Sequence, residues 1–485
     1  MERIPARCCC RRLRWTSFSA FPREPPPPLR TTMKTKNRGS ARQARTLGLV
    51  HLGCPKNQVD SEEMLAVLAQ DGWTLVGDPD DADVLVVNTC AFIDAAKEES
   101  LSAIRDAVRR KKRGRCQKVL VAGCLAQRYA GRLAEEMPDV DAIVGVGHTQ
   151  ELPEYLRATF RGERPVVSTP PPPEWQEIGA RLMTTPPWTT YLRIGEGCDH
   201  TCSFCAIPSF RGGWRSRPAE KLLDEVRMLV DLGLKEAVLV GQDTTLYGRE
   251  TRWEWNLARL VRELGKIEGL RWQRIMYAHP GRVDRSIVEL FGEVPNLAAY
   301  IDLPFQHGDD RMLKRMRRAG STAQYLRLVE ELRERCPHIA IRSTFLLGFP
   351  GETEEEFENC LKFLEAARPD HAGAFVYSHE EGTPAFEMDS DVPRQVAEER
   401  RAALMETQRR ISRERLRELE GREIEVLVEA QAGPGRMTGR SERDAPEVDG
   451  LVELSGSGIR PGEIVRAKVV ETGDHDLKAV AAGCV

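Results

Sequence analysis

Short apolar runs alternate with amphipathic stretches over residues 46–161. The apolar runs lie at 47–52, 84–87, 119–122 and 142–144, and helical patterns at 61–70 and 95–111 separate some of them. This alternation predicts a parallel sheet covered by helices on both faces. We therefore expect an N-terminal α/β domain over 46–161.

A proline-rich segment at 162–187 follows, and we expect it to be a linker because repeated prolines cannot sustain a helix or an inner strand. Strand and helix patterns then alternate again in a domain placed at 188–416. Six such repeats predict a partial parallel (β/α)6 barrel whose chemistry lies at the carboxyl ends of its strands. Its strands are expected at 191–194, 237–240, 274–277, 299–303, 340–347 and 372–377.

The pattern changes once more after a charged helix expected at 393–420. From Gly421 short alternating strands with glycine turns predict a small antiparallel barrel, with strands at 423–429, 450–454 and 464–471. We place this third domain at 417–485. The whole chain is thus of the α/β class, with a small β-barrel at its C-terminal end.

The first 45 residues show no hydrophobic periodicity. Twelve Lys and Arg stand against two Glu there, so this head carries a net charge of +10. An organelle transit peptide is Arg-rich and poor in acids in the same way. A disordered basic extension, or a start placed upstream of a true beginning at Met33, is the interpretation we favour.

Composition narrows the possible functions. The 485 residues are 41% hydrophobic and 30% charged, with a net charge of -3, and no run of eighteen apolar residues occurs. This excludes a membrane-spanning protein and a generally basic protein that coats nucleic acid. Thirteen cysteines without a secretory signal pattern favour metal or redox chemistry over disulfides.

Three of these cysteines form one compact motif. Cys198, Cys202 and Cys205 have the spacing C-x3-C-x2-C directly after the first expected barrel strand. Three thiolates on one loop can hold three irons of a 4Fe-4S cluster and leave the fourth iron open for a ligand. A structural zinc site is the alternative, but it normally needs a second cysteine knuckle, which the sequence lacks.

Three further cysteines are far apart in the sequence. Cys54, Cys90 and Cys124 each follow an apolar run of the N-terminal domain. Because the carboxyl ends of parallel strands lie along one edge of a sheet, these thiols are expected to converge there. A second cluster with one open iron is the functional interpretation, and three buried thiols at strand ends are the alternative.

The C-x3-C-x2-C loop resembles the radical S-adenosylmethionine signature. Together with the upstream three-cysteine domain and the terminal barrel, which resembles a TRAM domain of the OB-like kind, residues 46–485 resemble the methylthiotransferases. Three strings are similar to the ribosomal-protein branch, the RimO-type enzymes: Cys54-Pro-Lys-Asn57, Met276-Tyr-Ala-His-Pro280 and Glu380-Glu-Gly-Thr383.

The resemblance implies an enzyme with two 4Fe-4S clusters and S-adenosyl-L-methionine as methyl donor and radical source. The cluster ligands would be the six cysteines, with no catalytic residue beyond them. The reaction would attach a methylthio group to the β carbon of an aspartate in the twelfth protein of the small ribosomal subunit. Implied partners are that protein, an electron donor such as flavodoxin or ferredoxin and a sulfur source, in the cytoplasm and without a membrane.

Two glycine-bearing segments also resemble cofactor-binding segments of the superfamily. Gly241, Gln242 and Asp243 end one expected barrel strand, and Gly348 follows a later one. Glycine at such a place lets a ligand approach the backbone. Ordinary strand-to-helix turns are the alternative explanation.

Two other functions stay open at this point. A transfer-RNA adenosine 2-methylthiotransferase would use the same chemistry on a different substrate. A non-enzymatic iron–sulfur scaffold or electron carrier would use the clusters alone. The charge of residues 421–485, eight Lys and Arg against twelve Asp and Glu, favours a basic protein substrate over RNA because RNA binding needs a positive surface.

Overall fold

The computed structural model describes residues 45–167, 174–252, 254–389 and 392–484. Apart from Arg45, the expected basic extension lies outside these ranges. The described residues form two compact units, one made of 45–167 with 178–182 and the other of the remaining residues. No helix within the described ranges is long and apolar enough to cross a membrane.

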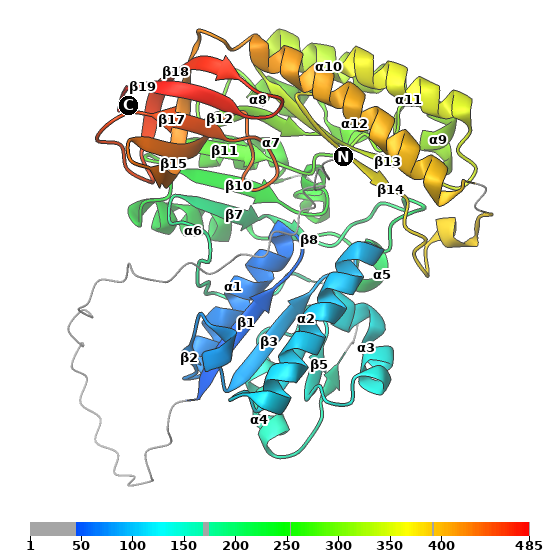
Figure 1. The fold of residues 1–485 in the computed structure, drawn as a ribbon, viewed down its shortest axis with the longest axis vertical. Coiled ribbons are helices and arrows are strands. Elements are labelled where there is room, and N and C mark those ends of the chain that lie inside the picture. Colours follow the sequence, from blue (N-terminus) through cyan, green and yellow to red (C-terminus); the bar gives the residue numbers. More distant parts are fainter. Residues whose placement is uncertain (1–44, 168–173, 253, 390–391, 485) are drawn as a thin grey trace. The chain divides into compact units, whose positions relative to one another are not determined.

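The first unit is built on a six-stranded, entirely parallel sheet (Figure 1). The strands that the sequence predicts are present, and two short strands are added at the edges. In spatial order they are β2 (Thr74–Leu75), β1 (Thr46–His51), β3 (Val84–Thr89), β4 (Lys118–Gly123), β5 (Ala142–Val144) and β6 (Val166–Val167). The strand β6 comes from the proline-rich segment and takes an edge position, where proline neighbours are tolerated.

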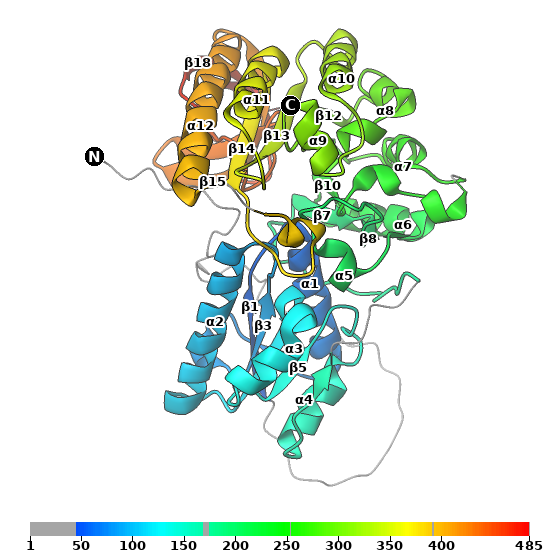
Figure 2. The same ribbon diagram turned by 90° about the vertical axis from the view of Figure 1, so that its right-hand side faces the viewer.

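Helices cover both faces of this sheet, and Figure 2 shows α2 and α1 on opposite sides of it. One apolar cluster joins the sheet to two of the helices through side chains such as Leu68 and Leu156. The helices are α1 (Pro55–Gln70), α2 (Asp94–Arg113), α3 (Cys124–Glu136) and α4 (Leu152–Phe160). The helix α1 begins six residues earlier than the sequence predicts, because its first two turns are polar yet buried and hide the helical periodicity.

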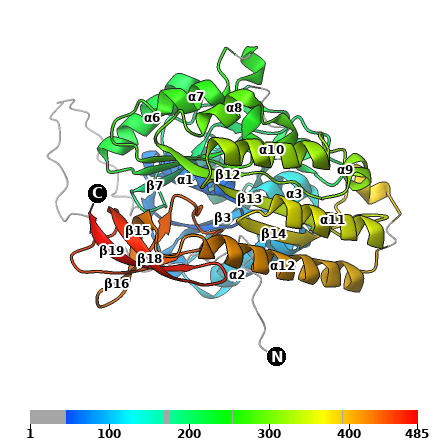
Figure 3. The ribbon, with the colours of Figure 1, turned by 90° about the horizontal axis from the view of Figure 1, so that it is seen from above.

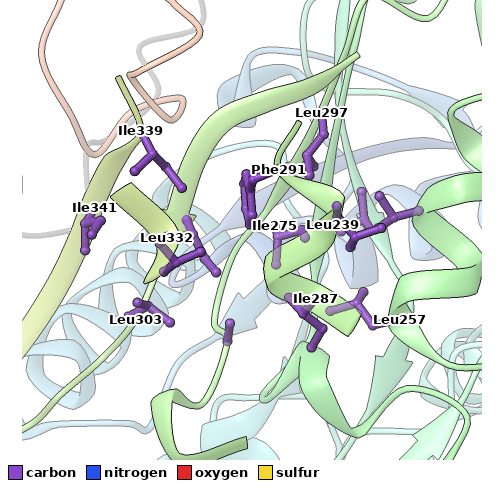
Figure 4. Packing of buried hydrophobic residues seen from close by; sticks show 14 of the residues in the cluster. Leu239, Leu257, Ile275, Ile287, Phe291, Leu297, Leu303, Leu332, Ile339 and Ile341 are labelled. Atoms are coloured by element: carbon purple, nitrogen blue, oxygen red, sulfur yellow. The ribbon is translucent and has the colours of Figure 1, made fainter. Parts of the chain in front are cut away.

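The second unit contains the predicted partial barrel, an open parallel sheet of six strands. Their spatial order is β14 (His371–Val376), β13 (Ala340–Leu347), β12 (Leu297–Asp302), β11 (Trp272–Ile275), β10 (Glu236–Val240) and β7 (Thr189–Arg193). Figure 4 shows its apolar core, in which Leu239, Ile275 and Ile341 of the strands pack against Leu257, Ile287 and Leu332 of the helices.

Helices lie along the outer side of this sheet, as Figure 3 shows. They are α6 (Ala219–Asp231), α7 (Leu257–Leu264), α8 (Arg285–Leu290), α10 (Thr322–Arg335) and α11 (Glu354–Ala367), while α5 (Ile207–Arg211) and α9 (Asp310–Arg315) are short. A two-stranded ribbon of β8 (Gly195–Glu196) and β9 (Arg215–Ser216) follows β7. The long helix α12 (Arg394–Arg417) leads to the last strands.

The C-terminal strands close a five-stranded barrel in the order β15 (Glu423–Gly433), β16 (Arg436–Ser441), β17 (Val452–Ser455), β19 (Leu477–Cys484) and β18 (Ile464–Thr472). The expectation of a purely antiparallel barrel needs one correction, because β17 and β19 pair in parallel. The strands β16 and β19 are additions to the three that the sequence predicts.

Buried ion pairs fasten this small barrel to the amino ends of the sheet strands. Glu236 at the start of β10 is bonded to Arg440 of β16 at 2.6 Å and to Arg274 of β11 at 2.8 Å, and the three side chains are at most 1% exposed. Arg342 of β13 pairs with Asp449 in the loop between β16 and β17. A buried charge that loses its partner is strongly destabilising, so the loop and the sheet hold each other in place.

Glu236→Gln leaves two buried guanidinium groups facing a neutral amide. We expect it to lower the stability of the second unit by about 3–5 kcal/mol, measured as the shift of its unfolding transition in urea. Glu263→Gln is the matched control. Glu263 is a partly exposed residue of α7 that pairs with the exposed Lys266 just after this helix, so the substitution should cost less than about 1 kcal/mol. Equal midpoints for the two variants would contradict this account of the interface.

Candidate metal centres

The first three-cysteine set lies on neighbouring strands of the first unit. Cys54 caps α1 just after β1, Cys90 follows β3 directly, and Cys124 begins α3 directly after β4. β1, β3 and β4 are adjacent and run in the same direction. The three residues therefore stand at one edge of the sheet, as the pattern of the sequence predicts.

The side chain of Asn57 connects the three strand ends. Its Nδ2 donates to the carbonyl oxygen of Leu52 at 3.1 Å and to that of Thr89 at 2.9 Å. Its Oδ1 lies 3.5 Å from the sulfur of Cys124 and accepts a hydrogen bond from that thiol. Asn57 is fully buried. One amide thus fixes the spacing of the segments that carry the cysteines.

Two glycines let the segments approach so closely. At Gly53, where φ is +102°, an added Cβ would lie 2.9 Å from the Cβ of Cys90 and 3.3 Å from its sulfur. At Gly123, with φ +93°, it would lie 2.3 Å from the Oδ1 of Asn88. Both positions therefore require glycine, for reasons of space as well as of backbone conformation.

The surroundings of this set suit anionic sulfur. Cys54 and Cys124 lie at the amino ends of α1 and α3, where the helix dipoles attract negative charge. Within the described residues no three His, Cys, Asp or Glu side chains gather around the position of a single metal ion. A 4Fe-4S cluster places each thiolate on a different iron, and three thiols at one sheet edge provide donors of the kind such a cluster takes.

The second set lies on the loop between β8 and α5 of the second unit. Cys198 N–H donates to the carbonyl of Gly212 at 3.0 Å, and Cys205 N–H donates to that of Cys202 at 3.2 Å. Gly197, with φ +82°, leaves no room for a Cβ, which would lie 2.1 Å from the carbonyl oxygen of Gly213. These contacts fold the C-x3-C-x2-C motif into one tight loop.

Burial makes the thiol of Cys198 a poor acid when it is free. It raises the pKa of Cys198 to about 12, and the neighbouring Cys205 and Asp243 add to the shift. The Cys198 thiol therefore stays protonated at neutral pH unless a cation binds it, so metal binding at Cys198 must release its proton. The donor set fits an iron–sulfur cluster, whose irons supply that positive charge.

Two histidines surround Asp243, one of the predicted cofactor contacts. The Oδ2 of Asp243 lies 2.5 Å from Nε2 of His200, inside the cysteine loop, and the rings of His200 and His279 stack with centroids 4.4 Å apart. Although burial raises the pKa of Asp243, the hydrogen bond and charge of His200 hold it below its usual value. His200 is thus engaged with Asp243, and this carboxylate anchors the loop.

The other predicted cofactor contacts have structural explanations as well. A Cβ on Gly241 would lie 2.9 Å from the ring of Trp214, and one on Gly348 would lie 2.4 Å from the Cβ of Ala397 in α12. Gln242 donates to Glu196 at 2.9 Å, and its Oε1 is buried without a partner among the described residues. That orphaned oxygen leaves Gln242 the best placed of the three to bind a ligand.

At the level of the sequence, Asn57 enters only as part of a family string, and no role is assigned to Asn57 or to Arg318. Asn57 lies one helical turn after Cys54, a spacing that could have revealed it had the start of α1 been known. Arg318, in the turn after α9, donates from Nη1 to the sulfur of Cys202 at 3.8 Å. Nothing in the sequence around Arg318 indicates that contact.

The family comparisons agree with this architecture and first define a class. Residues 192–364 match the radical SAM superfamily, residues 46–145 match an uncharacterized protein family designated UPF0004, and residues 421–481 match the TRAM domain. The solved radical S-adenosylmethionine methyltransferase TsrM from Kitasatospora setae resembles the chain with a TM-score of 0.51, at 17% identity over 70% of this chain and 75% of that one. The resemblance to TsrM shows the fold.

Curated relatives then identify the family. Proteins named ribosomal protein uS12 methylthiotransferase RimO are 44% identical in Symbiobacterium thermophilum, over 89% of this chain and 90% of the relative, and 43% identical in Desulforamulus reducens, over 89% and 98%. The relative in Geobacter sulfurreducens is 43% identical over 89% and 97%. The chain belongs to this methylthiotransferase family within the radical SAM superfamily. The predicted methylthiotransferase family and the predicted fold class are confirmed.

Asn57→Ala should weaken the first centre without unfolding the unit. Losing the amide that spaces the three strand ends is expected to lower the affinity for iron about 10- to 100-fold, as for other residues that orient metal ligands. The measurement is iron and sulfide content in the full chain carrying Cys198, Cys202 and Cys205→Ala, so that only the first set can bind iron.

The control is Asn296→Ala, which removes an amide hydrogen bond to the carbonyl of Leu270 in the second unit. It should keep the iron content of its parent. Full iron content in Asn57→Ala would show that the amide does not organise the centre.

Proposed function

We propose that the chain replaces a hydrogen on the β carbon of an aspartate in ribosomal protein uS12 with a methylthio group. The observation that carries this proposal is the presence of two separate three-cysteine centres, each on a motif of the family whose members carry that name. A carrier of electrons alone has little use for two centres that each leave an iron open.

The six cysteines are proposed as the cluster ligands. Cys198, Cys202 and Cys205 would hold the cluster that binds S-adenosyl-L-methionine, and Cys54, Cys90 and Cys124 would hold the one that carries the sulfur. When bound, these groups supply a radical able to break an unactivated C–H bond, which no side-chain base can do. Gly241, Gln242, Asp243 and Gly348 are proposed to line the cofactor site, and no other side chain is proposed as catalytic.

The residues of the chain have definite tasks in this scheme. Asn57 spaces the ligands of the first centre, and Asp243 holds the loop of the second through His200. The orphaned Oε1 of Gln242 is available to accept a hydrogen bond from the cofactor. His279 stays neutral, since burial, helped by the charges of Arg318 and His200, lowers its pKa to about 2.

The domain division proposed from the sequence agrees with the family matches, which fall inside 46–161, 188–416 and 417–485. The sulfur source and an electron donor such as flavodoxin or ferredoxin are further proposed partners, and the cytoplasm, where ribosomes work, is the proposed location. The transfer-RNA alternative is not favoured, because the relatives are named for a ribosomal protein.

The cysteine sets predict two separable activities. Replacing Cys198, Cys202 and Cys205 with Ala should remove about half of the iron and abolish reductive cleavage of S-adenosylmethionine, because each set holds one cluster. Replacing Cys54, Cys90 and Cys124 should remove the other half and leave cleavage intact while product formation stops. Iron analysis and a cleavage assay under strong reductant measure both effects.

The buried Cys116 and Cys336, which belong to neither set, provide the control. The double variant Cys116→Ala, Cys336→Ala should keep all the iron. Either triple variant with a full iron content would refute the assignment of that set.

The substrate is tested in cells that lack this chain. Mass spectrometry of their ribosomal proteins and transfer RNA should show uS12 without the methylthio group on its aspartate and unchanged adenosine modification, because the proposed target is the protein. The intact chain, returned to these cells, should restore the modification, and the triple Cys198, Cys202, Cys205→Ala variant should not. Loss of the adenosine modification with normal uS12 would instead support the transfer-RNA function.

A further inference from the structure

The segment that follows α9 is bonded to the cysteine loop. The backbone N–H of Ser203 donates to the carbonyl of Met316 at 3.0 Å, and the hydroxyl of Ser203 donates to that of Arg315 at 2.8 Å. Met316 is fully buried and packs in one apolar cluster with Phe204. The loop and the turn after α9 therefore keep a fixed relation to each other.

Arg318 is held within this turn at both ends. Arg317 has a left-handed backbone with φ +54°, and the N–H of Arg318 donates to the carbonyl of Leu313 at 2.8 Å. At the other end, Nη2 donates to the carbonyl of Pro304 at 2.6 Å and Nη1 to the sulfur of Cys202 at 3.8 Å. The guanidinium has little freedom to leave the sulfur.

The positive charge of Arg318 has no carboxylate beside it. In the described part of the chain no carboxylate forms an ion pair with its guanidinium, which donates to the Pro304 carbonyl and to the Cys202 sulfur and also interacts with the hydroxyl of Tyr325. Its Nε is buried without a partner there. A partly buried cation normally requires an anion nearby. The sulfur of Cys202, once it is a thiolate on a cluster, is an anion at this place.

The first centre has the opposite arrangement. There the Oδ1 of Asn57, an acceptor, faces the sulfur of Cys124. The amide cannot turn around without losing two hydrogen bonds, because Nδ2 is bonded to two carbonyl oxygens. The structure thus places a cationic donor on the sulfur of Cys202, whereas it places a neutral amide oxygen on the sulfur of Cys124.

We propose that Arg318 is a positioning residue that raises the reduction potential of the cluster on Cys198, Cys202 and Cys205. One-electron reduction by an external donor adds one negative charge to the cluster and breaks no bond. A positive charge and an N–H donor at a ligand sulfur stabilise the reduced form, and both hydrogen bonds to sulfur and nearby charge set such potentials. The inference rests on the proposed function, since it requires a cluster on this loop.

A redox titration followed by electron paramagnetic resonance tests the proposal. The parent is the full chain with Cys54, Cys90 and Cys124→Ala, so that the signal comes from one cluster. Arg318→Gln should shift the midpoint to a more negative potential, and Arg318→Lys, which keeps the charge, should shift it less. Arg327→Gln, which removes a charge from the exposed side of α10, should leave the midpoint unchanged.

An Arg318→Gln variant with a full iron content and the midpoint of the parent would overturn the inference and leave the proposed function intact. If the parent itself binds no iron, the proposed function fails instead.

A second measurement covers the case in which Arg318→Gln does not assemble a cluster. In the parent labelled with 15N-arginine, the reduced cluster should show a weak 15N hyperfine coupling, which Arg318→Lys should abolish. Absence of that coupling in the labelled parent would equally overturn the proposal.

Discussion

Placing three thiolates beside one another away from water is electrostatically unfavourable, and both units of this chain are built around that constraint. The raised pKa of Cys198, to about 12, is its direct expression, since burial and the neighbouring sulfurs oppose ionisation. In the proposed assignment of the six cysteines, positive charge comes from the irons and from the chain. The chain contributes the helix amino ends at Cys54 and Cys124 and the guanidinium of Arg318 at Cys202.

The sequence made the positions of the cysteines predictable but not the groups that hold them. Cys54, Cys90 and Cys124 could be placed together because each follows an apolar run, and parallel strands end at a common edge. The role of Asn57 was missed because the first turns of α1 are polar and buried, so the helical periodicity does not show there. Polar residues that serve a site break the same periodicity from which helices are predicted.

Two other features show the same limit. Gly241 and Gly348 could be recognised as places of close approach, but the sequence does not say what approaches; in the structure Trp214 and Ala397 do. The strand β16 shows little hydrophobic alternation, because one of its buried side chains is Arg440, which forms an ion pair with Glu236 in a distant part of the chain. The residue type at such positions is set by contacts with residues distant in sequence, and a single sequence does not reveal those contacts.

The buried ion pairs between the C-terminal barrel and the sheet of the second unit also affect which substrate the barrel favours. The expectation of poor RNA binding rests on the net charge of -4 in residues 421–485. Some of those charges are buried in ion pairs between the small barrel and the sheet. Two acids and two bases of this segment have side chains that are at most 9% exposed: Asp444, Asp449, Arg440 and Arg443. Acids and bases are withdrawn in equal number, so the excess of four negative charges stays with the residues that remain. The TRAM domain is thus attached by buried ion pairs to the six-stranded sheet of the second unit and keeps a net negative charge on its solvent-facing side chains. A negative surface suits a basic ribosomal protein better than a phosphate backbone.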